Sequence, residues 1–248
     1  MAVIHQEVVD SFPVLQAHRG YHVHCAENTM ESLQQAKTHG FKACEFDVRL
    51  SQDGVVVLHH DSSLMRIHHD QRAVSQTDWI ELKRLGVTRL EDVLTSDDVP
   101  EFLNIEVKNE SYGDFSLEKS ILDLLNRLPH QHQILLSSFN PLSLMFFQHQ
   151  LAPFPRALIV NRQREAGNPI YLREMWLDGL LETQFLHVDW QSLDRRLLLL
   201  NQARGRRVSV WTVNDETIAN NNLQMGVASI ISDDLMPEKI NPHVGGVE

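Results

Sequence analysis

The sequence has few of the features that mark a secreted, membrane-spanning or disulfide-stabilised protein. Its 248 residues include two cysteines, Cys25 and Cys44, which are too few for a disulfide framework. The amino terminus has no basic start followed by a long apolar run, and no stretch approaches the roughly 18 apolar residues that a membrane span needs. We therefore expect no signal peptide, no stable membrane insertion and, by default, a cytoplasmic location.

Positive charge is also scarce. The chain carries 22 lysines and arginines against 33 aspartates and glutamates, which gives a formal net charge of −11. Proteins that bind nucleic acid usually present a basic face, so this balance argues against a nucleic-acid partner. A small phosphate-bearing substrate stays compatible, because a cleft can be locally positive in an acidic protein. The oligomeric state is left open, a homo-oligomer included.

Low-complexity segments and Pro- or Gly-rich linkers are absent, which predicts a single domain over residues 1–248. Short apolar runs alternate with stretches of helical periodicity. The strand-like runs cover residues 14–17, 43–50, 55–58, 102–107, 134–137, 156–160, 185–188, 208–213 and 228–231. The helical stretches cover residues 28–37, 115–128, 141–151, 169–177, 194–204 and 215–225. Such alternation favours a parallel sheet covered by helices.

About eight strand units in this length predict an α/β fold of the closed (β/α)8, TIM-type barrel, with an open doubly wound sheet as the alternative. Residues 59–88 break the rhythm, and we interpret them as a small insertion after the second strand, over one mouth of the barrel. The helix at 28–37 is expected to begin at Asn28 as N-cap, with Glu31 three residues later.

Two carboxylates stand two residues apart in a strand-like run. Glu45 and Asp47 should point to the same side of the strand, because side chains alternate between the two faces. Crowded carboxylates repel each other unless a cation or a proton lies between them, and a hard ion such as Mg²⁺ or Ca²⁺ suits oxygen ligands. The alternative is a strand face with solvated acids.

The same spacing recurs in a later run. Glu106 and Lys108 should share one face, with Asn104 behind them. Glu106 could complete the metal site and Lys108 could hold a phosphate oxygen. A structural ion pair across the barrel mouth is the alternative.

Histidines end two strand-like runs. His18 is followed by Arg19, whose planar guanidinium matches phosphate oxygens, and His60 follows the run at 55–58. The chain has 14 histidines, so position is what singles these two out. Carboxyl ends of barrel strands form the active face, and histidine titrates near neutral pH. His18 and His60 are therefore candidates for a general acid and base.

Several segments taken in order resemble the glycerophosphodiester phosphodiesterases. The segments are HRG at 18–20, AENT at 26–29, CEFDVRLSQDGVVVLHHDSSLMR at 44–66, LNIEVK at 103–108, VSVWTVND at 208–215 and GVASIISDD at 226–234. The resemblance implies a (β/α)8 barrel with a small insertion and hydrolysis of glycerophosphodiesters to glycerol 3-phosphate and an alcohol. It also implies one divalent cation, Mg²⁺ or Ca²⁺.

Carried onto this sequence, the resemblance assigns its functional residues one by one. His18 and His60 match the catalytic histidines, Arg19 and Lys108 match the phosphate-contacting cations, and the metal carboxylates correspond to Glu45, Asp47 and Glu106. The family usually has proline where this chain has Ala26, and threonines where Ile67 and His68 follow Arg66. It also usually has an aspartate where Ala228 and Ser229 precede the last apolar run. These departures bear on loop rigidity and on which alcohol is accepted.

Aromatic residues lie near the ends of two further strand-like runs. Phe139 and Trp211 could form an apolar wall for the glycerol, although Trp211 could equally pack the barrel. Asp233 is interpreted as structural.

Two other functions stay open. His22 and His24 form an H-x-H element followed by Cys25, as in zinc-dependent barrel hydrolases. Against this, Gly20 breaks the preceding strand, and carboxylate pairs favour a harder ion. The second alternative is a barrel that binds phosphodiesters without turnover.

Overall fold

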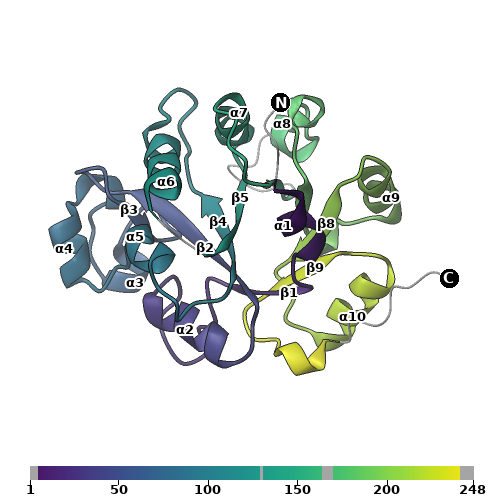
Figure 1. Ribbon diagram of the computed structural model, residues 1–248, viewed down its shortest axis with the longest axis horizontal. Helices are drawn as coiled ribbons and strands as arrows, with labels where there is room; N and C mark the ends of the chain where they lie inside the picture. The colour runs from purple at the N-terminus through teal and green to yellow at the C-terminus, as the bar shows by residue number, and fades with distance from the viewer. Residues whose placement is uncertain (1–4, 129–130, 164–169, 241–248) are drawn as a thin grey trace.

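Eight parallel strands close into a barrel in the computed structural model, which describes residues 5–128, 131–163 and 170–240 (Figure 1). The barrel strands are β1 (Leu15–His18), β2 (Ala43–Leu50), β4 (Phe102–Val107), β5 (Gln133–Ser138), β6 (Arg156–Val160), β7 (Phe185–Asp189), β8 (Arg207–Trp211) and β9 (Ser229–Ser232). β1 pairs with both β2 and β9, so the sheet has no free edge within the barrel. The predicted (β/α)8 fold is confirmed.

A ninth strand lies outside the barrel. β3 (Val56–Leu58) pairs antiparallel with β2, with Val48 opposite Leu58 and Leu50 opposite Val56. The sequence pattern counted this run with the other strand units, so its direction is a correction. The chain leaves β2, turns at residues 51–55 and comes back along it, because a hairpin this short joins only antiparallel strands.

Helices surround the strands as an outer ring (Figure 1). The longer ones are α2 (Met30–Thr38), α6 (Ser116–Arg127), α7 (Pro141–His149), α9 (Arg195–Ala203) and α10 (Glu216–Gln224), and shorter ones are α1 (Gln6–Ser11), α5 (Leu90–Leu94) and α8 (Ile170–Arg173). Single 3-10 turns cover Asp178–Leu180, Trp190–Ser192 and Pro237–Lys239. The helix expected over 169–177 is wrong in length, since α8 has four residues, and residue 169 lies outside the described residues.

Alternation along each strand separates the barrel interior from the helix-facing core. Cys44, Phe46 and Val48 of β2 join the large core between strands and helices, as do Leu103 and Ile105 of β4. The residues between them face the barrel interior, because successive side chains of a strand point to opposite faces. The hydrophobic pattern of the sequence thus determined which polar residues point inward.

Helix α1 closes the amino-terminal end of the barrel. Val8, Val9 and Phe12 pack with inward residues near the start of five strands, which are Ala43, Phe102, Leu135, Ala157 and Phe185. The Phe12 ring meets Phe102 and Phe185 edge-on, with centroids 5.5 and 5.2 Å apart. Burial of one such ring contributes about 1.5–3 kcal/mol. The amino-terminal end of the barrel is therefore filled by apolar side chains, and polar site residues are expected at its opposite end.

The region predicted as an insertion forms a small subcluster beside β2 and β3. It contains α3 (Met65–His68), a 3-10 turn (Val74–Gln76) and α4 (Trp79–Arg84). Its core consists of Val57, Leu64, Val74, Leu82 and Val87, all of which are buried. Weak helical periodicity in the sequence reflects these short elements, which bury a small satellite core. Among the described residues, no helix combines the length and the apolar character required to cross a membrane.

The start of α2 differs from the expectation by one residue. Thr29 is the N-cap and shares a capping box with Ser32, whereas Asn28 precedes it with a φ of 56°. This left-handed backbone is one that asparagine tolerates better than most residues. It frees the Asn28 side chain for a different role in the site.

Candidate active site and metal centre

Strand register brings three carboxylates together at the carboxyl end of the barrel. Asp47 of β2 lies opposite Glu106 of β4, and Glu45 lies between His18 of β1 and Asn104 of β4. One oxygen from each of Glu45, Asp47 and Glu106 lies within 4.8 Å of the others, and all three side chains are buried. In the part of the chain that the structure describes, this is the only group of three or more His, Cys, Asp or Glu side chains close enough together to hold an ion.

The raised pKa values of two carboxyl groups in this cluster show that its negative charge is only partly compensated. Burial and the charges of Asp47 and Glu106 raise the pKa of Glu45 well above its usual range. Burial and the charge of Asp47 likewise raise the pKa of Glu106, with Lys108 opposing. Glu45 Oε1 has no hydrogen-bond partner. Three buried carboxylates with an unpaired oxygen among them fit a hard divalent ion such as Mg²⁺ or Ca²⁺.

Asn28 binds both the side chain and the backbone of Asp47. Its Nδ2 donates to Asp47 Oδ2 at 2.8 Å, and its Oδ1 accepts from the Asp47 backbone N–H at 2.9 Å. Burial alone raises the pKa of Asp47, yet the charges of Lys108, His60 and Arg19 bring it well below its usual range. Sequence reasoning gave Asn28 only a capping role, because a loop residue's long-range partner leaves no local pattern.

The two predicted cations line the site but are paired with acids. Lys108 Nζ lies 3.1 Å from Asp47 Oδ1 and also contacts Glu106 Oε1. Arg19 Nη1 donates to Glu27 at 2.9 Å, and its Nε lies 3.5 Å from Asp47. Burial opposes the charge on Lys108, but the adjacent carboxylates raise its pKa. Both residues therefore stay charged at the pocket wall.

Each candidate histidine is held by an aspartate through Nδ1. His18 Nδ1 lies 2.7 Å from Asp233 Oδ1, and its Nε2 lies 3.8 Å from Glu45 Oε2. His60 Nδ1 lies 2.7 Å from Asp61 Oδ1. This pairing fixes the orientation of each ring and leaves Nε2 for other contacts. Burial, reinforced by the charge of Lys108, lowers the pKa of His60.

His60 reaches the site by a route that differs from the sequence interpretation. It follows β3, which is not a barrel strand, so it does not lie at the carboxyl end of one. Because β3 runs back along β2, the His59 backbone N–H donates to the Asp47 carbonyl at 3.0 Å, which sets the next residue beside the carboxylates. The hairpin thus delivers His60 to the rim from the side of the insertion.

The insertion is tied to both histidine loops by one arginine. Arg66 of α3 donates to Asp61 Oδ2 at 2.6 Å and to Glu27 Oε1 at 2.6 Å. Glu27 also binds Arg19, so a continuous ionic network links the two sides of the site. Sequence reasoning missed Asp61 and Asp233 as histidine partners. For Asp233, its place directly after the last strand, at the active face of a barrel, was a signal that could have indicated it.

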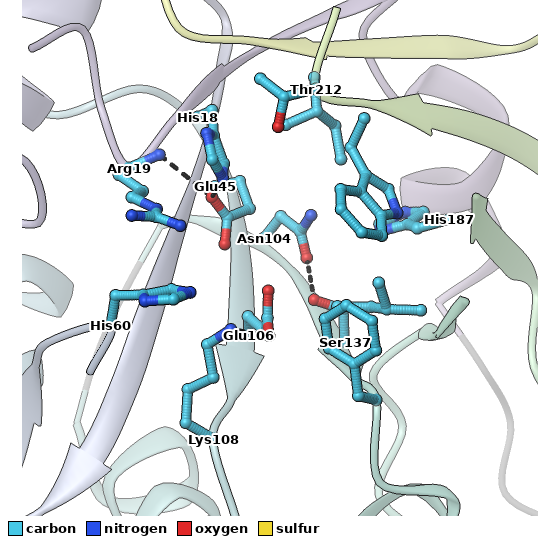
Figure 2. A pocket seen from close by; sticks show the side chains of 14 residues that line it. His18, Arg19, Glu45, His60, Asn104, Glu106, Lys108, Ser137, His187 and Thr212 are labelled. Carbon is cyan, nitrogen blue, oxygen red and sulfur yellow. Dashed lines mark hydrogen bonds and ion pairs between the residues drawn. The ribbon is translucent and has the colours of Figure 1, made fainter. Parts of the chain in front are cut away.

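One pocket collects these side chains (Figure 2). It is lined by His18, Arg19, Glu45, His60, Asn104, Glu106, Lys108, Ser137, Phe139, Ile159, His187, Trp211, Thr212 and Ile231. His18, Arg19 and His60 lie on one side, with His187 and Ser137 on the other. The Phe139 and Trp211 rings line the same pocket and meet edge-on with centroids 5.6 Å apart.

The histidines of the zinc alternative do not form a comparable centre. His22 Nδ1 contacts the Gly20 carbonyl at 3.1 Å, and His22 Nε2 lies 3.9 Å from Asp233 Oδ1. His24 is exposed.

Comparison with known proteins decides the family. A model of the glycerophosphoryl diester phosphodiesterase family matches residues 18–236, the range that holds every site residue described above. The chain belongs to this family. It is accordingly a phosphoric diester hydrolase of the glycerophosphodiester phosphodiesterase class.

Relatives in this family cover most of the chain. A glycerophosphodiester phosphodiesterase of Bacillus altitudinis is 26% identical over 232 residues, which are 88% of this chain and 93% of that protein. A probable glycerophosphodiester phosphodiesterase 2 of Mycobacterium tuberculosis is 28% identical over 245 residues, covering 89% and 87% of the two chains.

Solved structures of the family share the barrel. An Oleispira antarctica phosphodiesterase, in complex with the product sn-glycerol-3-phosphate, superposes with a TM-score of 0.79 at 25% identity, over 94% of this chain and 97% of that one. A glycerophosphodiester phosphodiesterase from Thermotoga maritima has a TM-score of 0.70 at 26% identity, covering 89% and 94%.

Proposed function

We propose that this enzyme hydrolyses glycerophosphodiesters to glycerol 3-phosphate and an alcohol, with His18 and His60 as its acid–base pair and one divalent cation held by Glu45, Asp47 and Glu106. The observation that supports this best is the common pocket of both histidines with Glu45 and Glu106, two members of the buried carboxylate cluster. A phosphodiester anion repels nucleophiles, so hydrolysis requires neutralised phosphoryl oxygens and a protonated leaving group. The pocket offers groups for both tasks.

The chain's own residues divide these tasks. The Arg19 guanidinium and the Lys108 ammonium sit at the pocket wall, where they would bind phosphoryl oxygens. One histidine would take the proton of the nucleophile and the other would protonate the departing alcohol oxygen, each transfer contributing about 10²–10⁴-fold. The nucleophile is either water or the neighbouring glycerol hydroxyl, and in the second case water then opens the cyclic phosphate. When bound, Mg²⁺ or Ca²⁺ would add positive charge against the same oxygens. The aspartates on both Nδ1 atoms would stabilise the protonated imidazole of either ring.

The departing alcohol would leave toward polar grooves. A cavity of about 390 Å³ shares His60 and Lys108 with the catalytic pocket and is also lined by Arg49, Asn109 and Glu110. A second cavity of about 440 Å³ adjoins it between the insertion and the loop after β4, and Ser62, Ser75 and Ser111 are among its lining residues. Charged and hydroxyl side chains suit a hydrophilic alcohol better than an acyl chain. We therefore expect glycerophosphoethanolamine or a similar diester to be cleaved faster than a lysophospholipid.

We also infer that the chain acts as a single domain and that the insertion at 59–88 belongs to the site. His60 lies in that region, and Arg66 binds Glu27 from the opposite loop. The substrate is a small molecule that binds from solution.

A direct assay tests the proposal. Release of glycerol 3-phosphate from several glycerophosphodiesters is measured with and without a chelator for the wild type, His18→Ala and His60→Ala, with His24→Ala as the exposed control. We expect turnover that the chelator removes, a loss of at least about 10²-fold in the first two variants and none in the control. Absence of metal-dependent turnover on every diester would refute the proposal. A strong zinc preference, with activity lost in His24→Ala but kept in Glu45→Ala, would instead support the H-x-H centre.

A further inference from the structure

A buried histidine that the proposed mechanism does not use lines the catalytic pocket. His187 lies in the middle of β7, opposite Ile159 of β6 and Ser209 of β8. Leu186 and Val188 on either side of it belong to the helix-facing core, so His187 points into the barrel. His187 is 1% exposed, and Figure 2 shows it across the pocket from Arg19 and His60.

The polar atoms around His187 lack partners. His187 Nε2, Ser209 Oγ and Trp211 Nε1 are all buried and make no hydrogen bond within the described residues. Ser209 is the register partner of His187, and Trp211 stands two residues further along the same face of β8. Nearly all buried polar groups in proteins are satisfied, so three exceptions on adjacent strands call for a physical account.

Other polar side chains of the barrel interior form a satisfied chain. Ser137 Oγ donates to Asn104 Oδ1 at 2.8 Å, and Asn104 Nδ2 donates to Gln16 Oε1 at 2.9 Å. Gln16 Nε2 then donates to Ser229 Oγ at 3.1 Å. A purely structural polar layer would be expected to include His187 in such a chain. Apart from Arg19 and the carboxylates of the proposed metal site, the unpaired groups that line or adjoin the pocket lie on the side formed by β7 and β8.

We propose that His187 is a substrate-binding residue that hydrogen-bonds the terminal hydroxyl of the glycerol moiety, the hydroxyl farthest from phosphorus. This inference rests on the proposed function and names how its substrate is recognised. The phosphate-binding cations lie on the opposite side of the pocket, and the polar grooves for the alcohol open beyond His60 and Lys108. The remaining side of the pocket, where His187 lies next to Trp211, is therefore the one available to the glycerol.

The chemistry of the ring matches a hydroxyl. Burial lowers the pKa of His187 to about 3, so the imidazole is neutral at physiological pH. A neutral imidazole has one N–H donor and one acceptor, and a hydroxyl is likewise both a donor and an acceptor. A neutral ring offers no charge to a phosphate, which separates its role from those of Arg19 and Lys108.

The test compares two substrates in three proteins. The substrates are a glycerophosphodiester and the analogue whose terminal carbon lacks the hydroxyl, a propane-1,2-diol phosphodiester. The proteins are the wild type, His187→Leu and His187→Gln, whose amide can replace Nε2. We expect His187→Leu to lower kcat/KM for the glycerol substrate about 10- to 100-fold, the range for one lost hydrogen bond in a buried site. The wild type should lose a similar factor on the deoxy analogue.

The decisive observation is non-additivity. His187→Leu should cause no further loss on the deoxy analogue, because the contact is already gone, and His187→Gln should recover part of the discrimination. Ser209→Ala, at the neighbouring position outside the pocket lining, should leave the ratio between the two substrates unchanged. Equal losses on both substrates, or no loss on either, would overturn the role of His187 and leave the proposed function intact.

If the wild type shows no turnover, the proposed function is refuted, and binding measurements then test the role of His187 separately. Calorimetry then compares sn-glycerol 3-phosphate with propane-1,2-diol 1-phosphate in the same proteins. Weaker binding of the first ligand alone in His187→Leu supports the inference. Equal binding of both ligands by the wild type, or no binding, refutes it.

Discussion

Asp233 Oδ1 lies 2.7 Å from His18 Nδ1, although the two residues are 215 positions apart in the chain. The contact forms because β9, which ends just before Asp233, pairs with β1, which ends at His18. Burial alone raises the pKa of Asp233, but the hydrogen bond and charge of His18 lower it to about 2. The carboxylate is therefore ionised, orients the imidazole and stabilises its protonated form.

Replacement of Asp233 by asparagine should impair catalysis more than folding. Asp233→Asn keeps the size of the side chain but removes its charge, and we expect kcat to fall about 10²-fold with a small change in Tm. Steady-state kinetics and thermal unfolding measure the two effects. Asp234→Asn, at the adjacent exposed position, is the matched control. A similar fall in kcat for both variants would contradict a specific role for Asp233.

Divalent ions should stabilise the protein through the three carboxylates. At a metal concentration 100 times the Kd, binding to the folded state contributes about 2.7 kcal/mol, which raises Tm by about 5–10 °C for a chain of this size. Mg²⁺ and Ca²⁺ titrations followed by thermal unfolding measure this shift, which Glu45→Gln should abolish. Without metal, Glu45→Gln should be more stable than the wild type at pH 8, because burial and two neighbouring acids disfavour the Glu45 carboxylate. Glu110→Gln, on the exposed loop nearby, should respond to metal as the wild type does.

Loss of Arg66 should loosen the catalytic loops. Arg66→Met removes the contacts to Asp61 and Glu27, and we expect kcat/KM to fall about 10-fold through less precise placement of His60 and Arg19. Arg72→Met is the control, because Arg72 also binds two acids, Asp70 and Glu81, but both belong to the insertion. If the two variants lose activity equally, general loosening of the insertion explains the effect.

Burial of neutral His187 should make stability depend on pH. Its folded-state pKa of about 3 lies below the unfolded value of about 6.5, so the unfolded chain takes up the proton first as pH falls. The stability contribution is complete above pH 6.5 and is lost progressively toward pH 3. Between pH 7 and pH 5 this loss amounts to about 2 kcal/mol. Urea unfolding at both pH values should show that His187→Leu loses about this much less than the wild type, whereas His149→Gln, at an exposed position, should match the wild type. Identical losses in His187→Leu and the wild type would mean that His187 is not held neutral in the fold.

Local sequence patterns were sufficient to predict most strands of the barrel. The run at 43–50 coincides with β2, and its alternation correctly placed Glu45 and Asp47 on the inward face. The direction of β3 and the short α8 were mistaken, because strand pairing and helix length depend on packing partners elsewhere in the chain. The same reason explains the shift of the α2 N-cap from Asn28 to Thr29, since Asn28 is held by Asp47.

The sequence by itself determined the barrel and the polar residues that face its interior, because apolar residues must be buried on the helix-facing side of every strand. It also singled out His18, His60 and the three carboxylates as candidates. Only the tertiary structure decided which groups meet: Asp233 with His18 through closure of the barrel, His60 with the carboxylates through the returning hairpin, and His187 with the pocket. These contacts depend on strand register across the whole chain, which no local sequence pattern contains.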